Sequence, residues 1–384
     1  MMGSEIIAAV KRCFGKILSV LPLRNMILFE SMPDCSGNTK PVFDELVRRG
    51  YNRKYRMVWR LHQSEPGEHD RIPNVRYLKE GRRLYLRYYF AKMFISENAY
   101  FQKTRSKGQY MMHITHGGAL KKVNQYYRTP DDVDEVVTFS RYLIPVDAEN
   151  NGCDIGKINP LGYPRNDALL GERRNLSDLF PGHGFRKTIV WLPTFRQHKN
   201  HTDLRFSSIS IPIIHDSGSA RKVDDAAGRS GVLIVVKPHF AQDISFTKSL
   251  EMDNIVFIDD RFLQDRGMKL YDLLCSSDAL LTDYSSVYYD YLLTGRPIGL
   301  CWEDFDEYKA NEGFIVDTDT IMAGGEKIYT AEDLCAFIGR IGSESDLLAD
   351  ERAHVRTLVF GDTEQNSRST VRVADRVVEI LERL

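Results

Sequence analysis

Short apolar runs separated by amphipathic segments repeat along most of this chain. Apolar runs that predict strands occur in its first part at residues 26–30, 56–61, 74–78, 94–96, 111–115 and 136–139. Helical spacing fills the gaps between them, as in residues 41–49 and in the basic segment 82–94. Buried strands that alternate with helices predict a parallel sheet with right-handed crossovers.

The same alternation restarts after a break near residues 160–185. The second series of predicted strands is at residues 188–192, 231–237, 255–258, 279–282 and 297–301. Two such series predict an α/β protein with two Rossmann-like domains facing a cleft, over residues 25–170 and 171–384. The polar stretch 197–230 predicts a long loop. Residues 371–384 predict a final helix whose pattern fits packing on either domain, and we place it with the second domain.

The N-terminal segment is apolar but is interrupted by Lys11 and Lys16 and ended by Pro22. This pattern predicts an amphipathic helix within residues 1–24, which either lies on an anionic membrane surface or caps its own domain. The sequence contains no run near the roughly 20 apolar residues that a membrane-spanning helix needs.

Composition narrows the class of protein. Of 384 residues, 42% are hydrophobic and 27% are charged, which is typical of a globular chain and excludes wholesale disorder or a fibrous repeat. The formal net charge of −1 hides an asymmetry, because residues 1–128 hold 24 Lys or Arg against 10 Asp or Glu. A basic first third suggests an anionic partner: phosphate, acidic lipid or nucleic acid.

The six cysteines lie far apart and form no Cys-x-x-Cys pair. This spacing argues against a disulfide framework or a zinc site and favours a reducing compartment. We therefore expect no metal in the functional site.

Residues with reactive or charged side chains follow the predicted strands. His116 directly follows strand 111–115 and precedes Gly117, which lets a substrate approach closely; Lys121 lies one turn further on. Ligands collect at such strand ends in open parallel sheets. His116 is therefore either a proton acceptor or a turn histidine bonded to backbone.

The second series carries a set of candidate phosphate ligands at its strand ends. They are Arg196, Lys237, His239, Asp283, Ser285 and Ser286. Ser285 and Ser286 open a predicted helix, where hydroxyls and amides either bind an anion or serve as an ordinary cap. Arg165, near the predicted domain junction, either reaches a phosphate or pairs with Asp167. Cations and hydroxyls that converge without metal ligands indicate metal-independent phosphate chemistry.

Several short motifs occur in a fixed order along the chain. They are His-Gly-x-x-Leu-Lys (116–121), Gly-Tyr-Pro-Arg-Asn-Asp (162–167), Leu-Pro-Thr-Phe-Arg (192–196), Lys-Pro-His (237–239) and Thr-Asp-Tyr-Ser-Ser-Val (282–287), followed by Asp304 to Tyr308 and Gly313-Phe314. This ordered set resembles the CDP-glycerol glycerophosphotransferase family of teichoic-acid and capsule polyol-phosphate transferases.

The resemblance implies a glycosyltransferase-B-like fold and a transferase. Such an enzyme moves a polyol phosphate from CDP-glycerol or CDP-ribitol to a hydroxyl on a lipid-linked saccharide or polyol-phosphate acceptor, releasing CMP. His116 would be the catalytic base, and His239 would act with Arg196 and the Ser285–Ser286 pair on the donor's pyrophosphate. No cofactor is implied, because the CDP-polyol is a substrate. The implied location is the cytoplasm, at the inner face of an anionic membrane, without a nucleic-acid partner.

Two other classes of function remain open from the sequence. A nucleotide-sugar glycosyltransferase of the same fold would share the strand-end residues. A non-catalytic polyanion-binding protein would account for the basic first third, but it would leave His116 and His239 without a role.

Overall fold

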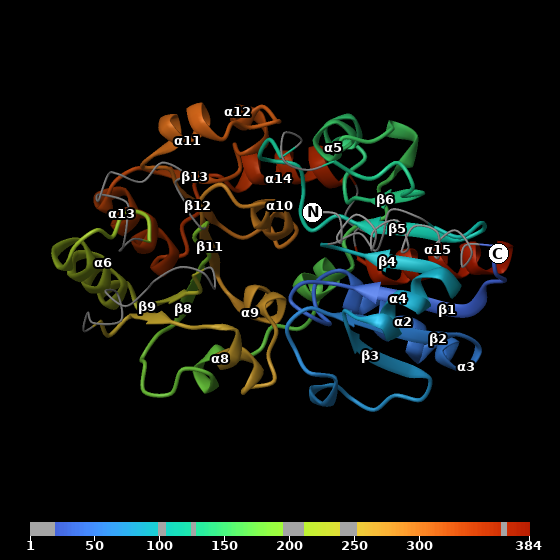
Figure 1. The fold of residues 1–384 in the computed structure, drawn as a ribbon. Coiled ribbons are helices and arrows are strands. Elements are labelled where there is room, and N and C mark those ends of the chain that lie inside the picture. Colours follow the sequence, from blue (N-terminus) through green and yellow to red (C-terminus); the bar gives the residue numbers. More distant parts are fainter. Residues whose placement is uncertain (1–19, 99–104, 124–127, 195–210, 239–251, 362–366) are drawn as a thin grey trace, which may run out of the picture. The chain divides into compact units, whose positions relative to one another are not determined.

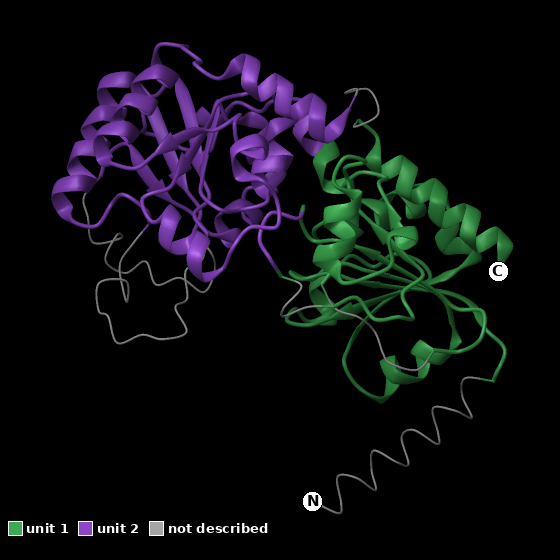
Figure 2. Ribbon diagram, turned by 90° about the horizontal axis from the view of Figure 1, so that it is seen from above, with its two compact units in different colours: residues 1–118, 123–167, 364–384 green, residues 119–122, 168–363 purple. Residues whose placement is uncertain are grey.

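The computed structural model describes residues 20–98, 105–123, 128–194, 211–238, 252–361 and 367–384, which divide into two compact units (Figure 2). The first unit contains residues 1–118, 123–167 and 364–384, and the second contains residues 119–122 and 168–363. The predicted amphipathic helix within residues 1–24 falls almost entirely outside the described residues.

The first unit is built on a parallel sheet with the strand order β3-β2-β1-β4-β5-β6-β7 (Figure 1). Its strands are β1 (Arg24–Glu30), β2 (Arg56–Leu61), β3 (Val75–Lys79), β4 (Ala91–Ser96), β5 (Tyr110–Ile114), β6 (Glu135–Val137) and β7 (Ile158–Asn159). Its helices are α2 (Thr39–Arg48), α3 (Tyr51–Lys54), α4 (Arg82–Phe90), α5 (Ile144–Asn151) and α15 (Ser369–Arg383), with short 3-10 turns at Pro66–Glu68 and Ile155–Lys157.

The second unit repeats this plan with the strand order β10-β9-β8-β11-β12-β13. Its strands are β8 (Lys187–Trp191), β9 (Val232–Val236), β10 (Ile255–Phe257), β11 (Ala279–Thr282), β12 (Ile298–Cys301) and β13 (Glu326–Ile328). Its helices are α6 (Ser217–Ser230), α8 (Asp260–Gln264), α9 (Leu270–Ser276), α10 (Val287–Leu292), α11 (Phe305–Asn311), α12 (Thr318–Ile321), α13 (Ala331–Gly342) and α14 (Ala349–Phe360). The prediction of two Rossmann-like parallel sheets is therefore confirmed.

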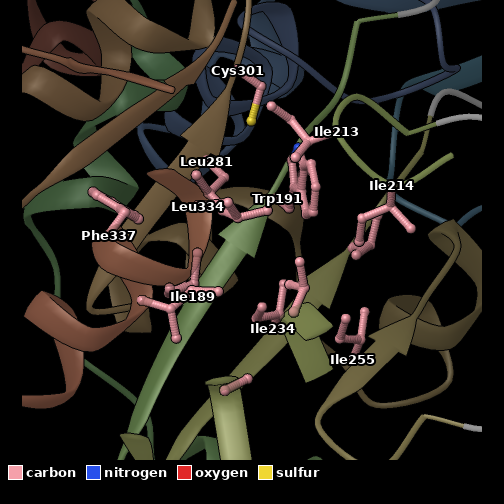
Figure 3. Close-up of a cluster of buried hydrophobic side chains, with 14 of the residues drawn as sticks. Ile189, Trp191, Ile213, Ile214, Ile234, Ile255, Leu281, Cys301, Leu334 and Phe337 are labelled. Atoms are coloured by element: carbon pink, nitrogen blue, oxygen red, sulfur yellow. The ribbon is translucent and has the colours of Figure 1, made fainter. Parts of the chain in front are cut away.

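Each sheet packs its apolar residues against amphipathic helices. In the second unit, Ile189, Trp191 and Leu281 from the strands contact Leu334 and Phe337 of α13 (Figure 3). In the first unit, Leu84 and Tyr88 of α4 pack on strand residues that include Met26, Leu28 and Val58. Burial of such side chains contributes about 1.5–3 kcal/mol each, so these cores fix the sheets that carry the site. None of the helices in the described ranges combines the length and apolar character that crossing a membrane requires.

Two predicted elements differ from the structure. Helix α4 ends at Phe90 rather than at residue 94, because Ala91 takes an extended backbone and begins strand β4 between β1 and β5. The predicted loop 197–230 contains α6, whose Asp216 side chain accepts a hydrogen bond from Ser219 N in a capping box. The Asp-x-x-Ser cap and the buried Val223 on the inner face stabilise a helix here despite the polar composition of the segment.

The C-terminal helix belongs to the first unit, whereas the sequence-based division placed it with the second. Helix α15 packs against α2, and Asp167 accepts hydrogen bonds from the backbone N–H groups of Ser369 and Thr370 at its start. Further along, Arg376 Nε donates to the buried Glu135 carboxylate at 3.0 Å. Apolar periodicity identifies the helix, but only these contacts decide which sheet it covers.

We expect the Arg376→Met substitution to destabilise the first unit by about 2 kcal/mol, because it removes the charged partner of a buried carboxylate. The matched control is Arg383→Met on the same helix, whose side chain is 65% exposed and whose loss should cost at most about 0.5 kcal/mol. Urea unfolding midpoints measure both. Equal midpoints for the two variants would contradict this account of how α15 is held.

Candidate functional site

The first unit places an exposed imidazole at a strand-end edge. Strands β1, β4 and β5 are neighbours, so the loops that follow them meet at one edge of the sheet. The strand order reverses between β1 and β4, which is where open α/β sheets bind ligands. His116 follows β5 at this edge, and its side chain is 61% exposed.

Glu97 is a buried carboxylate next to His116, with 1% of its side chain exposed. Its Oε1 lies 3.3 Å from His116 Nδ1. Its Oε2 accepts hydrogen bonds from the backbone N–H groups of Asn38 at 2.7 Å and Thr39 at 3.2 Å. A carboxylate at Nδ1 favours the tautomer with the proton on that nitrogen, which leaves Nε2 free to accept a proton.

Asn98 is a second neighbour of the ring, with its Nδ2 at 3.4 Å from His116 Nδ1. Its Oδ1 accepts from Met32 N at 2.8 Å, which fixes the orientation of the amide. An amide donor at Nδ1 would favour the opposite tautomer from the one that Glu97 favours. The carboxylate prevails, because a hydrogen bond to a charged acceptor is about twice as strong as one between neutral groups.

The loop before α2 approaches Glu97 so closely that only glycine fits. Gly37 has a φ of +61°, and a Cβ added there would lie 2.3 Å from Glu97 Oε2. A side chain at residue 37 would therefore displace the carboxylate, in addition to straining the backbone. Asn38 joins this loop to the site, because its Nδ2 donates to Thr115 O at 3.1 Å.

Arg165 also lies at this site. Its Nη1 is 3.9 Å from Glu97 Oε1 and its side chain is 11% exposed, while its backbone N–H donates to Asn38 Oδ1 at 3.2 Å. The sequence left open whether Arg165 pairs with Asp167 or reaches a phosphate. In the structure, the Asp167 carboxylate accepts hydrogen bonds from the start of α15 rather than from Arg165. Arg165 instead supplies positive charge beside the buried carboxylate.

Two nearby groups complete the edge. Glu30, at the end of β1, is fully buried and accepts hydrogen bonds from the backbone N–H groups of Glu97 at 3.2 Å and Asn98 at 3.1 Å. His113 lies within β5, and burial lowers its pKa to about 3, so it stays neutral at physiological pH. Of the two histidines in β5 and the loop after it, His116 is therefore the exposed one, and its ring lies next to a carboxylate.

The second unit has a corresponding buried carboxylate, Asp283, directly after β11. Its oxygens accept hydrogen bonds from Thr194 N at 3.0 Å and from Tyr284 N at 2.7 Å. The side chain is fully buried, and a phosphate would be repelled by its charge. Asp283, which the sequence suggested as a phosphate ligand, therefore positions the loop after β8 against the turn that carries Ser285 and Ser286.

Helix α10 holds that turn rigidly because its tyrosines are buried with their hydroxyls bonded. Tyr288 Oη donates to Ile321 O at 2.9 Å, and Tyr289 Oη donates to Ala119 O at 3.0 Å. Ser285 and Ser286, directly before the helix, are only half-buried. The turn therefore presents two hydroxyls from a fixed backbone.

Lys237, the residue after β9, forms an ion pair with Asp260 at 3.0 Å, and its side chain is 13% exposed. A phosphate ligand would have to compete with this carboxylate for the ammonium group. Arg196 and His239 lie outside the described residues, so their predicted roles stay predictions.

Gly117 and Lys121 lie on either side of the change from one unit to the other. Gly117 belongs to the first unit, and residues 119–122 belong to the second. There Lys121 pairs with Phe314 as a β-bridge and places its Nζ 5.4 Å above the Tyr308 ring. Among the described residues, no group of three His, Cys, Asp or Glu side chains converges as a metal site would require.

The family model described as CDP-Glycerol:Poly(glycerophosphate) glycerophosphotransferase matches residues 14–379. The chain belongs to this family. The match covers both units, including the strand-end loops with His116 and Ser285.

Curated relatives agree with this family. The chain is 26% identical over 380 residues to a teichoic acid glycerol-phosphate transferase of Staphylococcus aureus, covering 90% of each chain. It is 25% identical over 258 residues to a teichoic acid ribitol-phosphate primase of Bacillus spizizenii. That alignment spans 65% of this chain and 60% of the ribitol-phosphate primase. A second alignment, with a teichoic acid glycerol-phosphate primase of the same organism, spans 52% of that primase.

Solved structures show the same fold. A structure of the wall teichoic acid polymerase TagF superposes with a TM-score of 0.72 at 19% identity and covers 99% of this chain and 96% of that one. A putative UDP-N-acetylglucosamine 2-epimerase from Listeria monocytogenes gives a TM-score of 0.54 at 14% identity, with 94% and 98% covered. These likenesses support the predicted glycosyltransferase-B-like fold.

The candidate residues predicted from the sequence do not include Glu97 or Gly37, whereas Thr194 lies within the Leu-Pro-Thr-Phe-Arg motif (192–196). Glu97 follows the predicted strand 94–96 directly, so a rule that examines every strand end for carboxylates would have found it. The role of Gly37 follows from its close approach to Glu97, which no local sequence pattern indicates.

We expect Gly37→Ala to destabilise the protein more than Gly50→Ala. Both glycines have positive φ, but a Cβ at Gly50 meets nothing within 4 Å. The backbone penalty alone should cost about 1 kcal/mol in each variant, and displacement of Glu97 should add about 2 kcal/mol only at residue 37. Urea unfolding measures the difference, and equal losses would show that residue 37 has room for a side chain.

Proposed function

We propose that this chain transfers a glycerol phosphate, or a related polyol phosphate, from a CDP-activated donor to an acceptor hydroxyl on a lipid-linked cell-wall or capsule precursor. The observation that carries the proposal is the His116–Glu97 pair, an exposed imidazole held at Nδ1 by a buried carboxylate. The family and its teichoic acid relatives support the donor class.

The proposed chemical step begins at His116. Its Nε2 takes the proton of the acceptor hydroxyl, and the hydroxyl oxygen attacks the phosphorus that carries the polyol. The bond from this phosphorus to the bridging oxygen breaks, and CMP leaves with that oxygen. A positioned base contributes about 10²–10⁴ in rate, and the Glu97 carboxylate stabilises the imidazolium that forms.

The second unit would bind the donor. Ser285 and Ser286 would donate hydrogen bonds from their hydroxyls to the pyrophosphate. The Lys237 ammonium group would leave the Asp260 carboxylate and bind a phosphate oxygen. The resemblance adds Arg196 and His239 to this set. Fixed donors and cations are needed there because negative charge grows on the departing CMP in the transition state.

The proposed location is the cytoplasmic face of a membrane, because the acceptor is attached to lipid. The peripheral association does not need a membrane-spanning helix.

We expect His116→Ala to lower the rate of acceptor-dependent CMP release by 10²–10⁴-fold. Glu97→Gln should lower it by about 10²-fold and shift the acid limb of the pH–rate profile, because an amide can donate to Nδ1 and favour the wrong tautomer. Stopped assays of CMP across pH measure both variants.

The matched control is His62→Gln. His62 also pairs with a buried carboxylate, through Nε2 at 2.7 Å from Glu30 Oε1, but it follows β2, outside the proposed catalytic pair. Its CMP release should stay within about threefold of the unsubstituted protein. Near-normal rates in His116→Ala would show that another group acts as the base.

A donor screen separates this proposal from a nucleotide-sugar glycosyltransferase. We expect CMP from CDP-glycerol or CDP-ribitol in the presence of a lipid-linked acceptor, and no UDP from UDP-N-acetylglucosamine. Lys237→Ala should raise the KM for the CDP donor by about tenfold or more through loss of one charged contact. UDP release without CMP release would overturn the proposed donor class.

A further inference from the structure

A group of cations without carboxylate partners surrounds helix α4 in the first unit. We define the basic face as the following six residues: Arg24, Arg56, Arg76, Arg83, Arg87 and Lys92. They come from β1, β2, β3, α4 and β4. Within the described ranges, none of the six lies within ion-pair distance of a carboxylate, whereas Arg60 on the same sheet pairs with Glu80.

The strand members of the basic face point to the side of the sheet that α4 covers. Side chains two residues apart on a strand share a face. Each strand cation lies two residues before an apolar residue that packs with α4, in the pairs Arg24–Met26, Arg56–Val58, Arg76–Leu78 and Lys92–Phe94. The Arg24 guanidinium lies 4.8 Å above the ring of Phe90, which confirms its place beside α4.

The cations of the basic face repel one another. Burial lowers the pKa of Arg87, and the neighbouring charges of Arg56, Arg83 and Arg76 lower it further. Arg87 Nε is buried without a hydrogen-bond partner among the described residues. Like charges held together destabilise the fold, and a bound anion would relieve this repulsion.

Exposed apolar side chains accompany these cations. Leu86 of α4 is 42% exposed and lies between Arg83 and Arg87 in sequence. In the segment that leads to β1, Val20 is 81% exposed and Leu21 is 39% exposed. A soluble polyanion needs only the positive charge, whereas a lipid surface also accepts apolar side chains below its headgroups.

We propose that the basic face docks onto the anionic headgroups of a lipid bilayer, with Leu86 inserted at the interface. This inference rests on the proposed membrane location and assigns it a surface. Arg24 and Arg56 are the first residues of their strands, whereas His116 follows the last residue of β5. The strand members of the basic face therefore lie at the opposite ends of their strands from the loop that carries His116.

Vesicle sedimentation with the full chain tests the proposal. Phosphatidylcholine vesicles with about 30% phosphatidylglycerol should bind the protein, and pure phosphatidylcholine vesicles should bind at least tenfold less. Each cation near an anionic surface contributes about fivefold to partitioning. Binding should fall by tenfold or more between low and high salt, because salt screens these charges.

The decisive variant is Arg76→Gln combined with Arg83→Gln, since both side chains are exposed. Its partitioning onto anionic vesicles should fall by about 25-fold. The matched control is Arg221→Gln with Arg229→Gln, two exposed arginines of α6 in the second unit. That control changes the net charge equally and should stay within about twofold. Leu86→Ser should reduce binding severalfold without changing its salt dependence.

Two results would overturn the proposal. One is equal loss of vesicle binding in the two double variants, which would indicate a net-charge effect. The other is binding of soluble inorganic polyphosphate, sensitive to Arg76 and Arg83, without binding to anionic vesicles. CMP release from CDP-glycerol with a detergent-dispersed acceptor, measured in the same variants, should be unchanged. Failure of docking is thereby distinguished from failure of the proposed transferase activity.

Discussion

In each unit, a buried carboxylate directly after one strand accepts a backbone N–H from the loop that follows the neighbouring strand. Glu97 follows β4 and binds the loop after β1, and Asp283 follows β11 and binds the loop after β8. Both positions lie where the strand order reverses. A buried carboxylate is costly unless donors surround it, so each one holds in place the loop residues that donate to it. The loops that carry candidate chemistry depend on this constraint.

The two carboxylates differ in what they hold. Glu97 has one oxygen left for His116 after Oε2 binds the start of α2, so it can set the tautomer of an exposed imidazole. Asp283 accepts hydrogen bonds from Thr194 and Tyr284, and it supports the turn that carries the half-buried Ser285 and Ser286 before helix α10. The same structural device thus supports the proposed proton acceptor in one unit and the proposed phosphate contacts in the other, which are the two halves of the proposed transfer.

The charged side chains at the strand ends differ in burial and bonding from those of the basic face. Carboxylates that orient groups are buried and bonded at the strand ends, whereas the cations of the basic face are exposed or half-exposed and have no carboxylate partner among the described residues. Arg376, by contrast, has a carboxylate partner in Glu135. The glycerophosphotransferase family match covers the loops that carry these strand-end groups. The basic face is a separate feature, for which we propose a partner outside the chain.

The sequence by itself determined the two parallel sheets, because buried strands and amphipathic helices leave periodic patterns that local chemistry dictates. It also determined the family and the position of His116, because the ordered motifs are contiguous in the chain. Only the tertiary structure decided that α15 covers the first sheet, that Asp283 is a buried support, and that Glu97 holds His116. Those outcomes depend on contacts between residues far apart in sequence, such as Gly37 with Glu97, and no local pattern records such distances.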